Sequence, residues 1–159
     1  MIEIEWEEFA GDHLRNATDE MLDKNEDWIG RKLPVSLRQM MQEHGGEKPL
    51  NLIPKFPNKK VMLIECIYHA YFEEKEDNGY TIPFGTSALT DEDYLNYVSF
   101  SHVGNVFLCL DYNVREIDPP VIFVFRDSPS DDPDHRHFLA ENFDEFLEKY
   151  TVPMDQVKR

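Results

Sequence analysis

Two near-continuous apolar runs, Val106–Tyr112 and Val121–Arg126, constrain the fold of this chain more than any other feature of its sequence. Short apolar runs between polar segments are typical of strands, and strands that are apolar at nearly every position have both faces covered. We therefore expect a sheet with other elements packed on both sides. Further extended segments are expected at Leu50–Ile53, Val61–Phe72 and Tyr80–Phe84.

Two helices are predicted before these strands. Thr18 is a suitable N-cap for a helix that ends at Gly30, because its hydroxyl can accept a hydrogen bond from the first turn. Pro34 suits the start of a second helix, and Gly45-Gly46 ends it, because glycine readily adopts the left-handed conformation. We expect at least one of these two glycines to have a positive φ. The expected buried stripes are Met21, Leu22, Trp28 and Ile29 in the first helix, and Leu37, Met40, Met41 and His44 in the second.

A third helix is predicted near the other end of the chain, over residues 143–150. Asn142 is its expected N-cap, and Phe143, Phe146 and Leu147 lie on one face. A single helical turn is expected at residues 90–97. Helices at both ends with consecutive strands between them favour an α+β fold. We expect a single domain over residues 1–159, with a largely antiparallel central sheet flanked by N-terminal helices and a C-terminal helix.

Several segments occur in an order that resembles a known family. Leu33-Pro34, the apolar helix that follows and Gly45-Gly46 resemble the opening signature of the SUKH superfamily. Its middle strands and closing motif are similar to Ile82–Gly85, Leu108–Asp111, Pro120–Val124 and Leu139–Leu147. The resemblance covers residues 18–150. Two positions depart from the family pattern, because His44 stands where Asn is frequent and Leu37 where Tyr is common.

The SUKH superfamily includes fungal cell-wall-synthesis regulators and bacterial immunity proteins, and it is not known as an enzyme family. The resemblance therefore implies a non-catalytic protein-binding module. We expect an immunity protein that neutralises a cognate toxin domain, such as a basic nuclease. An intracellular regulatory or scaffold protein of the same family is the alternative.

The charge of the chain indicates the kind of partner. Its 32 acidic and 16 basic residues give a net charge of -16 and a pI near 4.6. Nucleic acids and anionic membranes bind cationic surfaces, so neither is expected as a partner, whereas a basic protein would be attracted. The N-terminus lacks a basic-then-apolar targeting pattern, and both cysteines lie within apolar runs as expected buried thiols. We therefore expect a cytoplasmic protein.

Acidic turns and tyrosines are the predicted partner-binding residues. Exposed acids would speed association with a basic protein, and tyrosine is enriched among the residues that dominate binding energy. Packing inside the protein is the alternative for each tyrosine. The candidates are Glu73, Glu74, Glu76, Asp77, Asp131, Asp132, Asp134, Tyr71, Tyr94, Tyr97 and Tyr112.

The segment from Asp131 to His137 also raises the possibility of a metal site. Its three aspartates, together with His135 and His137, could ligate a divalent ion, and a metal-dependent hydrolase is a lesser alternative. The spacing matches no known metal motif, so we favour an exposed acidic loop. Glycine-rich phosphate loops and a nucleophile elbow are absent from the sequence. We therefore expect no metal, no cofactor and no catalytic residue.

Overall fold

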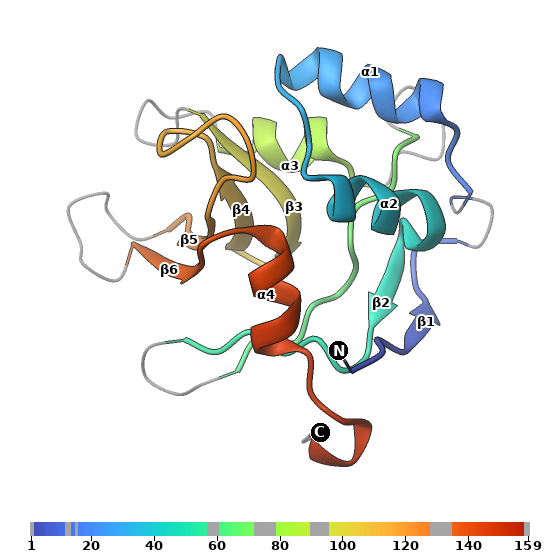
Figure 1. Cartoon of the computed structure of the whole chain (residues 1–159), viewed down its shortest axis with the longest axis vertical. Coiled ribbons are helices and arrows are strands. Elements are labelled where there is room, and N and C mark those ends of the chain that lie inside the picture. Colours follow the sequence, from blue (N-terminus) through green and yellow to red (C-terminus); the bar gives the residue numbers. More distant parts are fainter. Residues whose placement is uncertain are drawn as a thin grey trace.

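The computed structural model describes residues 2–11, 14, 16–56, 61–71, 79–89, 96–127 and 135–157. Figure 1 shows the arrangement of the helices and strands in this part of the chain, and the order confirms the expected α+β fold. The elements are β1 (Trp6–Glu8), α1 (Asp19–Ile29), α2 (Val35–His44), β2 (Glu47–Pro49), α3 (Ile82–Ser87), β3 (Tyr97–Val103), β4 (Val106–Asp111), β5 (Val121–Phe125), β6 (Arg136–Ala140), α4 (Phe143–Tyr150) and the short 3-10 helix η3 (Met154–Gln156).

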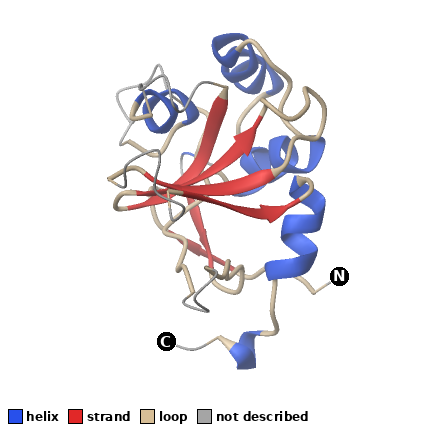
Figure 2. Ribbon diagram, turned by 90° about the vertical axis from the view of Figure 1, so that its left-hand side faces the viewer, coloured by secondary structure: helices blue, strands red, loops and turns tan. Residues whose placement is uncertain are grey.

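The main sheet is antiparallel, with the described strands in the order β3-β4-β5-β6. Helices lie on both sides of it, as Figure 2 shows. The larger core joins this sheet to α1, α2 and α4 through side chains that include Leu22, Leu37, Leu108, Phe123 and Phe146. A smaller core joins the sheet to Leu89 through Tyr97, Phe107, Cys109, Ile122 and Val124. The expected strands β4 and β5 are thus confirmed, with both faces buried.

The predicted helix ends are confirmed. The Thr18 hydroxyl accepts a hydrogen bond from the Met21 amide at 3.2 Å, and the Asn142 side chain caps α4 in the same way. Gly46 has a φ of 81°, as predicted for the end of α2. None of the helices in the described ranges is long and apolar enough to cross a membrane.

The buried stripe of α1 differs from the prediction at Trp28, which is 45% exposed, while Asn25 and Glu26 are buried instead. Glu26 tolerates burial because it accepts hydrogen bonds from the Leu33 amide at 2.8 Å and from Arg38 at 2.7 Å. A buried carboxylate is stable when it is paired in this way. The ion pair between Glu26 on α1 and Arg38 on α2 joins the two helices.

The prediction of a long strand at Val61–Phe72 is wrong. The described residues 61–71 contain only isolated bridges, although most of their apolar side chains are buried. Their backbone hydrogen bonds go to several partners. Ile67 pairs with Glu47 and Gly46, and the Tyr68 amide donates to the Phe100 carbonyl. The segment therefore connects β2 of the small β1-β2 sheet to β3 of the main sheet instead of joining one ladder.

Two further extended segments were wrongly predicted. Residues 82–87 form α3, because the Thr81 hydroxyl accepts a hydrogen bond from the Phe84 amide and Pro83 lies in the first turn. Near Leu50–Ile53, the strand is β2 at residues 47–49, and Leu52 makes an isolated bridge with Thr151. Most of the predicted turn at 90–97 lies outside the described residues, and Tyr97 begins β3.

The sequence reading also missed β3. The strand contains polar residues at positions that are buried in the structure. Ser99 and Ser101 are fully buried, and their hydrogen-bond partners come together only in the folded chain. The Ser101 hydroxyl donates to the Cys66 carbonyl at 2.7 Å, and a β-bulge between the two serines interrupts the register with β4. Without these partners, a run with so many polar residues does not show the pattern of a buried strand.

Candidate partner-binding groove

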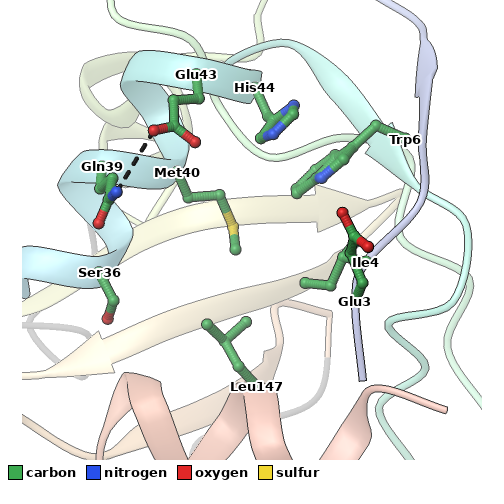
Figure 3. A pocket seen from close by; sticks show the side chains of 9 residues that line it. All are labelled: Glu3, Ile4, Trp6, Ser36, Gln39, Met40, Glu43, His44 and Leu147. Atoms are coloured by element: carbon green, nitrogen blue, oxygen red, sulfur yellow. Dashed lines mark hydrogen bonds between the residues drawn. The ribbon is translucent and has the colours of Figure 1, made fainter. Parts of the chain in front are cut away.

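A groove of about 350 Å³ lies between the N-terminal strand segment, α2 and α4. Figure 3 shows Met40 pointing into its middle, Leu147 below it and Trp6 at one end. This volume is near the lower end of the roughly 300–1,000 Å³ range of ligand pockets, so the groove can take a few side chains. The lining residues are Glu3, Ile4, Trp6, Ser36, Gln39, Met40, Glu43, His44 and Leu147.

Asn51 fastens the N-terminal wall of the groove. Its side-chain amide donates to the carbonyls of Glu3 and Val152 at 2.9 Å, and its side-chain oxygen accepts from the Glu5 amide at 2.8 Å. Asn51 is 1% exposed, and buried hydrogen bonds of this kind are costly to break. The antiparallel pairing of β1 with β2 then places Trp6 opposite Pro49. The N-terminal segment is thereby held against the rest of the fold.

Trp6 is held from one side by His44. The two rings are stacked, with centroids 4.3 Å apart and planes within 6° of parallel. His44 is oriented in turn by Glu47, whose Oε1 lies 2.8 Å from Nδ1. Because a carboxylate oxygen can only accept, the Nδ1–H donates this bond. The chain of contacts from Glu47 through His44 fixes an aromatic side chain that is partly open to solvent.

The wall formed by α2 corrects the predicted stripe of that helix. Leu37 and Met41 are buried in the core, as expected, but Met40 and His44 are only half-buried and face the groove. Positions 36, 40 and 43 follow one another at helical spacing, so one face of α2 lines the groove while the neighbouring face packs inward. Met40 is therefore less buried than predicted, because it packs against the core only in part, whereas Phe143 and Phe146 are confirmed as core residues.

The charged groups that line the groove are carboxylates. Glu43 lies on α2 and accepts a hydrogen bond from Gln39, while Glu3 lies on the N-terminal segment (Figure 3). No lysine or arginine occurs among the described residues that line it. An apolar floor with acidic sides is complementary to a segment that carries both aliphatic and cationic side chains.

Sequence reasoning missed this groove, although one signal was available. Residues 2–7 alternate strictly between apolar and acidic side chains, with Ile2, Ile4 and Trp6 in one series. Such alternation is typical of a strand with one face against the protein. In the structure this segment contains β1, which begins at Trp6.

Two of the predicted tyrosine anchors are core residues. Tyr97 and Tyr112 are each 3% exposed. The Tyr97 hydroxyl contacts Arg136, and the Tyr112 hydroxyl donates to the Lys32 carbonyl at 2.7 Å. Burial raises the pKa of both phenols. Both tyrosines thus pack inside the protein, which was the alternative to partner binding, and neither offers an exposed surface to a partner.

Tyr71 is half-buried against the larger core, with its ring near that of His69. It keeps part of its surface, but it does not line the groove. The remaining predicted partner-binding residues lie outside the described part of the chain: Glu73, Glu74, Glu76, Asp77, Tyr94, Asp131, Asp132 and Asp134.

Of the residues considered for a metal site, the structure describes only the two histidines. His135 is 3% exposed, and the half-buried His137 packs its ring 4.8 Å from that of Phe123. No group of three or more His, Cys, Asp and Glu side chains converges among the residues that the structure describes. The aspartates at 131, 132 and 134 are outside those ranges.

The two cysteines are free and buried, as expected. Burial raises the pKa of both thiols, so neither is a thiolate at neutral pH. This property is typical of structural thiols and makes both poor nucleophiles.

Comparison with known proteins identifies the fold family. Residues 16–149 match the sequence model of the SMI1/KNR4 family (SUKH-1). The match includes α2 and Leu147, whereas Glu3, Ile4 and Trp6 precede it. A search among curated proteins found no match to the chain.

Proposed function

Because the chain belongs to the SMI1/KNR4 family (SUKH-1), we propose that it is an immunity protein that binds and neutralises a basic toxin domain. Family membership is consistent with an immunity-type or regulatory protein, and members generally act on protein partners without catalysis. The observation that carries the proposal is the groove, which combines an aliphatic floor, a fixed tryptophan and acidic sides.

The net charge of -16 supports a basic partner. Solubility of a small domain needs a net charge of only about 2–8 in magnitude. A larger excess attracts a cationic protein from a distance and raises the association rate. This attraction does not by itself produce tight binding, so a contact with apolar anchors is also required.

The groove supplies such anchors. Trp6 is partly exposed and preorganised by His44, so it loses little conformational freedom when a partner packs on it. Met40 and Ile4 add apolar surface beside it. Tryptophan is among the residues most enriched at positions that dominate binding energy. These features favour protein binding at the groove over a purely electrostatic contact.

Co-expression with the product of the neighbouring gene tests the proposal. The toxin domain encoded there should arrest growth alone, and growth should recover when this chain is produced with it. The purified pair should form a complex of one copy of each. Recovery without complex formation, or a complex that leaves the toxin active, contradicts neutralisation. A stable complex with a non-toxic neighbour would instead support a regulatory or scaffold role.

A further inference from the structure

We propose that the groove binds a short cationic segment of the partner in which one long aliphatic side chain is flanked by lysine or arginine. The aliphatic side chain lies between Met40 and Leu147, and the flanking cations face Glu3 and Glu43. This inference rests on the proposed function, because it describes the part of the basic partner that the groove receives.

The floor of the groove selects the aliphatic side chain. Met40 reaches the middle of the groove from α2, opposite Leu147 from α4 (Figure 3). Leu147 is 6% exposed and belongs to the larger core, so packing fixes the position of its side chain. Methionine is unbranched and polarisable, and it adapts to the shape of an apolar side chain. The half-buried Met40 would therefore lose its remaining contact with water when the groove is filled.

The sides of the groove select the cations. Glu43 and Glu3 come from different walls, and Figure 3 shows them on opposite sides of Met40. A cation on each side of the aliphatic group can thus approach a different carboxylate. Trp6 adds a further attraction, because the cation of a lysine or arginine is attracted to the face of an indole ring. An acidic or neutral segment would lack these attractions to the two carboxylates and to the indole.

The N-terminal wall is the specificity-determining part of the groove. The α2 and α4 walls lie within the family match over residues 16–149, but Glu3, Ile4 and Trp6 lie before it. Asn51 and the β1-β2 pairing hold these three residues in place. The fold shared with the family therefore supplies the floor, and the preceding segment supplies an acid and an aromatic ring that discriminate between partners.

Peptide binding tests this inference without the toxin. The chain contains two tryptophans, so Trp28→Phe leaves Trp6 as the reporter of the groove. The probe is the blocked heptapeptide Gly-Lys-Lys-Leu-Lys-Lys-Gly, titrated at about 50 mM salt, where exposed charges act over about 14 Å or less. Trp6 emission should change and saturate. Replacing the leucine of the probe by glycine should weaken binding about tenfold, as expected for a buried aliphatic side chain.

Matched charge variants locate the binding. Glu3→Gln/Glu43→Gln should weaken probe binding about threefold or more, the effect expected for two exposed ion pairs. Glu20→Gln/Glu116→Gln removes the same charge from exposed carboxylates outside the groove, and it should change binding much less. Equal effects of the two double variants, or equal binding of the glycine probe, would overturn the inference. Such a result would leave the proposed function standing if the toxin still forms its complex through another surface.

Discussion

The indole of Trp6 and the imidazole of His44 lie parallel, with their centroids 4.3 Å apart. One residue comes from the N-terminal strand and the other from the end of α2, so the stack joins two walls of the groove. The buried carboxylate of Glu47 keeps the imidazole in this orientation. A tryptophan that is both partly exposed and fixed is well suited to anchor a partner.

Removal of the imidazole should loosen Trp6. We expect His44→Ala to lower the free energy of unfolding by about 1–3 kcal/mol, because it removes an aromatic contact and a hydrogen bond to a carboxylate. In the Trp28→Phe background, the fluorescence anisotropy of Trp6 should also fall. Ser36→Ala, on the same face of α2, serves as the control. Unchanged anisotropy in His44→Ala would show that the stack does not restrain the indole.

The helix α4 should depend strongly on Phe146. This side chain is fully buried, with its ring 5.8 Å from that of Phe100 and 5.5 Å from that of Tyr150. Phe146→Ala should cost about 3–5 kcal/mol, the range for loss of a buried aromatic ring. Chemical denaturation measures the change, with the exposed Phe138→Ala as control. A loss below about 1 kcal/mol would mean that α4 does not pack as described.

The fold was predictable where local chemistry decides the structure. Thr18, Asn142 and Gly46 mark helix ends through their own hydrogen bonds or backbone conformation, and β4 and β5 are apolar except for Asp111 at the end of β4. Prediction failed where partners come from elsewhere in the chain. The serines of β3 are buried only because other segments satisfy them, and residues 61–71 share their bonds between two sheets.

The candidate site was less predictable than the fold. The net charge shows that acidic side chains are in excess, but it does not show where the groove lies or which of them line it. Met40 has the spacing of a core residue and is half-exposed only because the N-terminal segment and α4 leave a groove around it. Conversely, the hydroxyl of Tyr112 is compatible with a position on the surface. The residue is buried in the structure, where this hydroxyl donates to the Lys32 carbonyl and Arg31 lies over the ring.

Acid should destabilise the protein partly through His102. Burial lowers the pKa of His102 below its ordinary value of 6.5, and the carboxylate of Glu65 opposes this shift. Nδ1 lies 2.7 Å from the Tyr68 hydroxyl, and the ring stacks against Tyr80 and Phe107. Because the unfolded chain binds the proton more readily, the stability from neutral His102 is complete above pH 6.5 and declines below it.

His102→Gln removes this titration and isolates its contribution. The difference in unfolding free energy between the wild type and the variant should shrink as the pH falls from about 7.5 to about 5. Chemical denaturation at each pH measures this difference. The contributions of the other titrating groups cancel, because both proteins contain them. A difference that stays constant or grows toward acid would contradict the lowered pKa.

The predicted acidic loops should affect the rate of binding to the toxin. Neutralising Glu73, Glu74, Glu76 and Asp77, or Asp131, Asp132 and Asp134, should slow association severalfold at about 50 mM salt and have little effect at about 500 mM. The dissociation rate should change less, because exposed charges act mainly during the encounter. Stopped-flow kinetics with the partner tests this. Association that ignores both salt and substitution would show that the acids are only a solvated surface.

The affinity of the toxin domain for two tryptophan variants tests the account most directly. Trp6 lies in the groove, whereas Trp28 is 45% exposed on α1 and serves as a control of the same residue type. Isothermal titration calorimetry should show Trp6→Ala weakening the complex by about thirtyfold or more, the loss of a residue that dominates binding. Trp28→Ala should change the affinity by less than about twofold. A Trp6→Ala variant that binds the toxin domain as tightly as the wild type would contradict the assignment of the groove as the binding site.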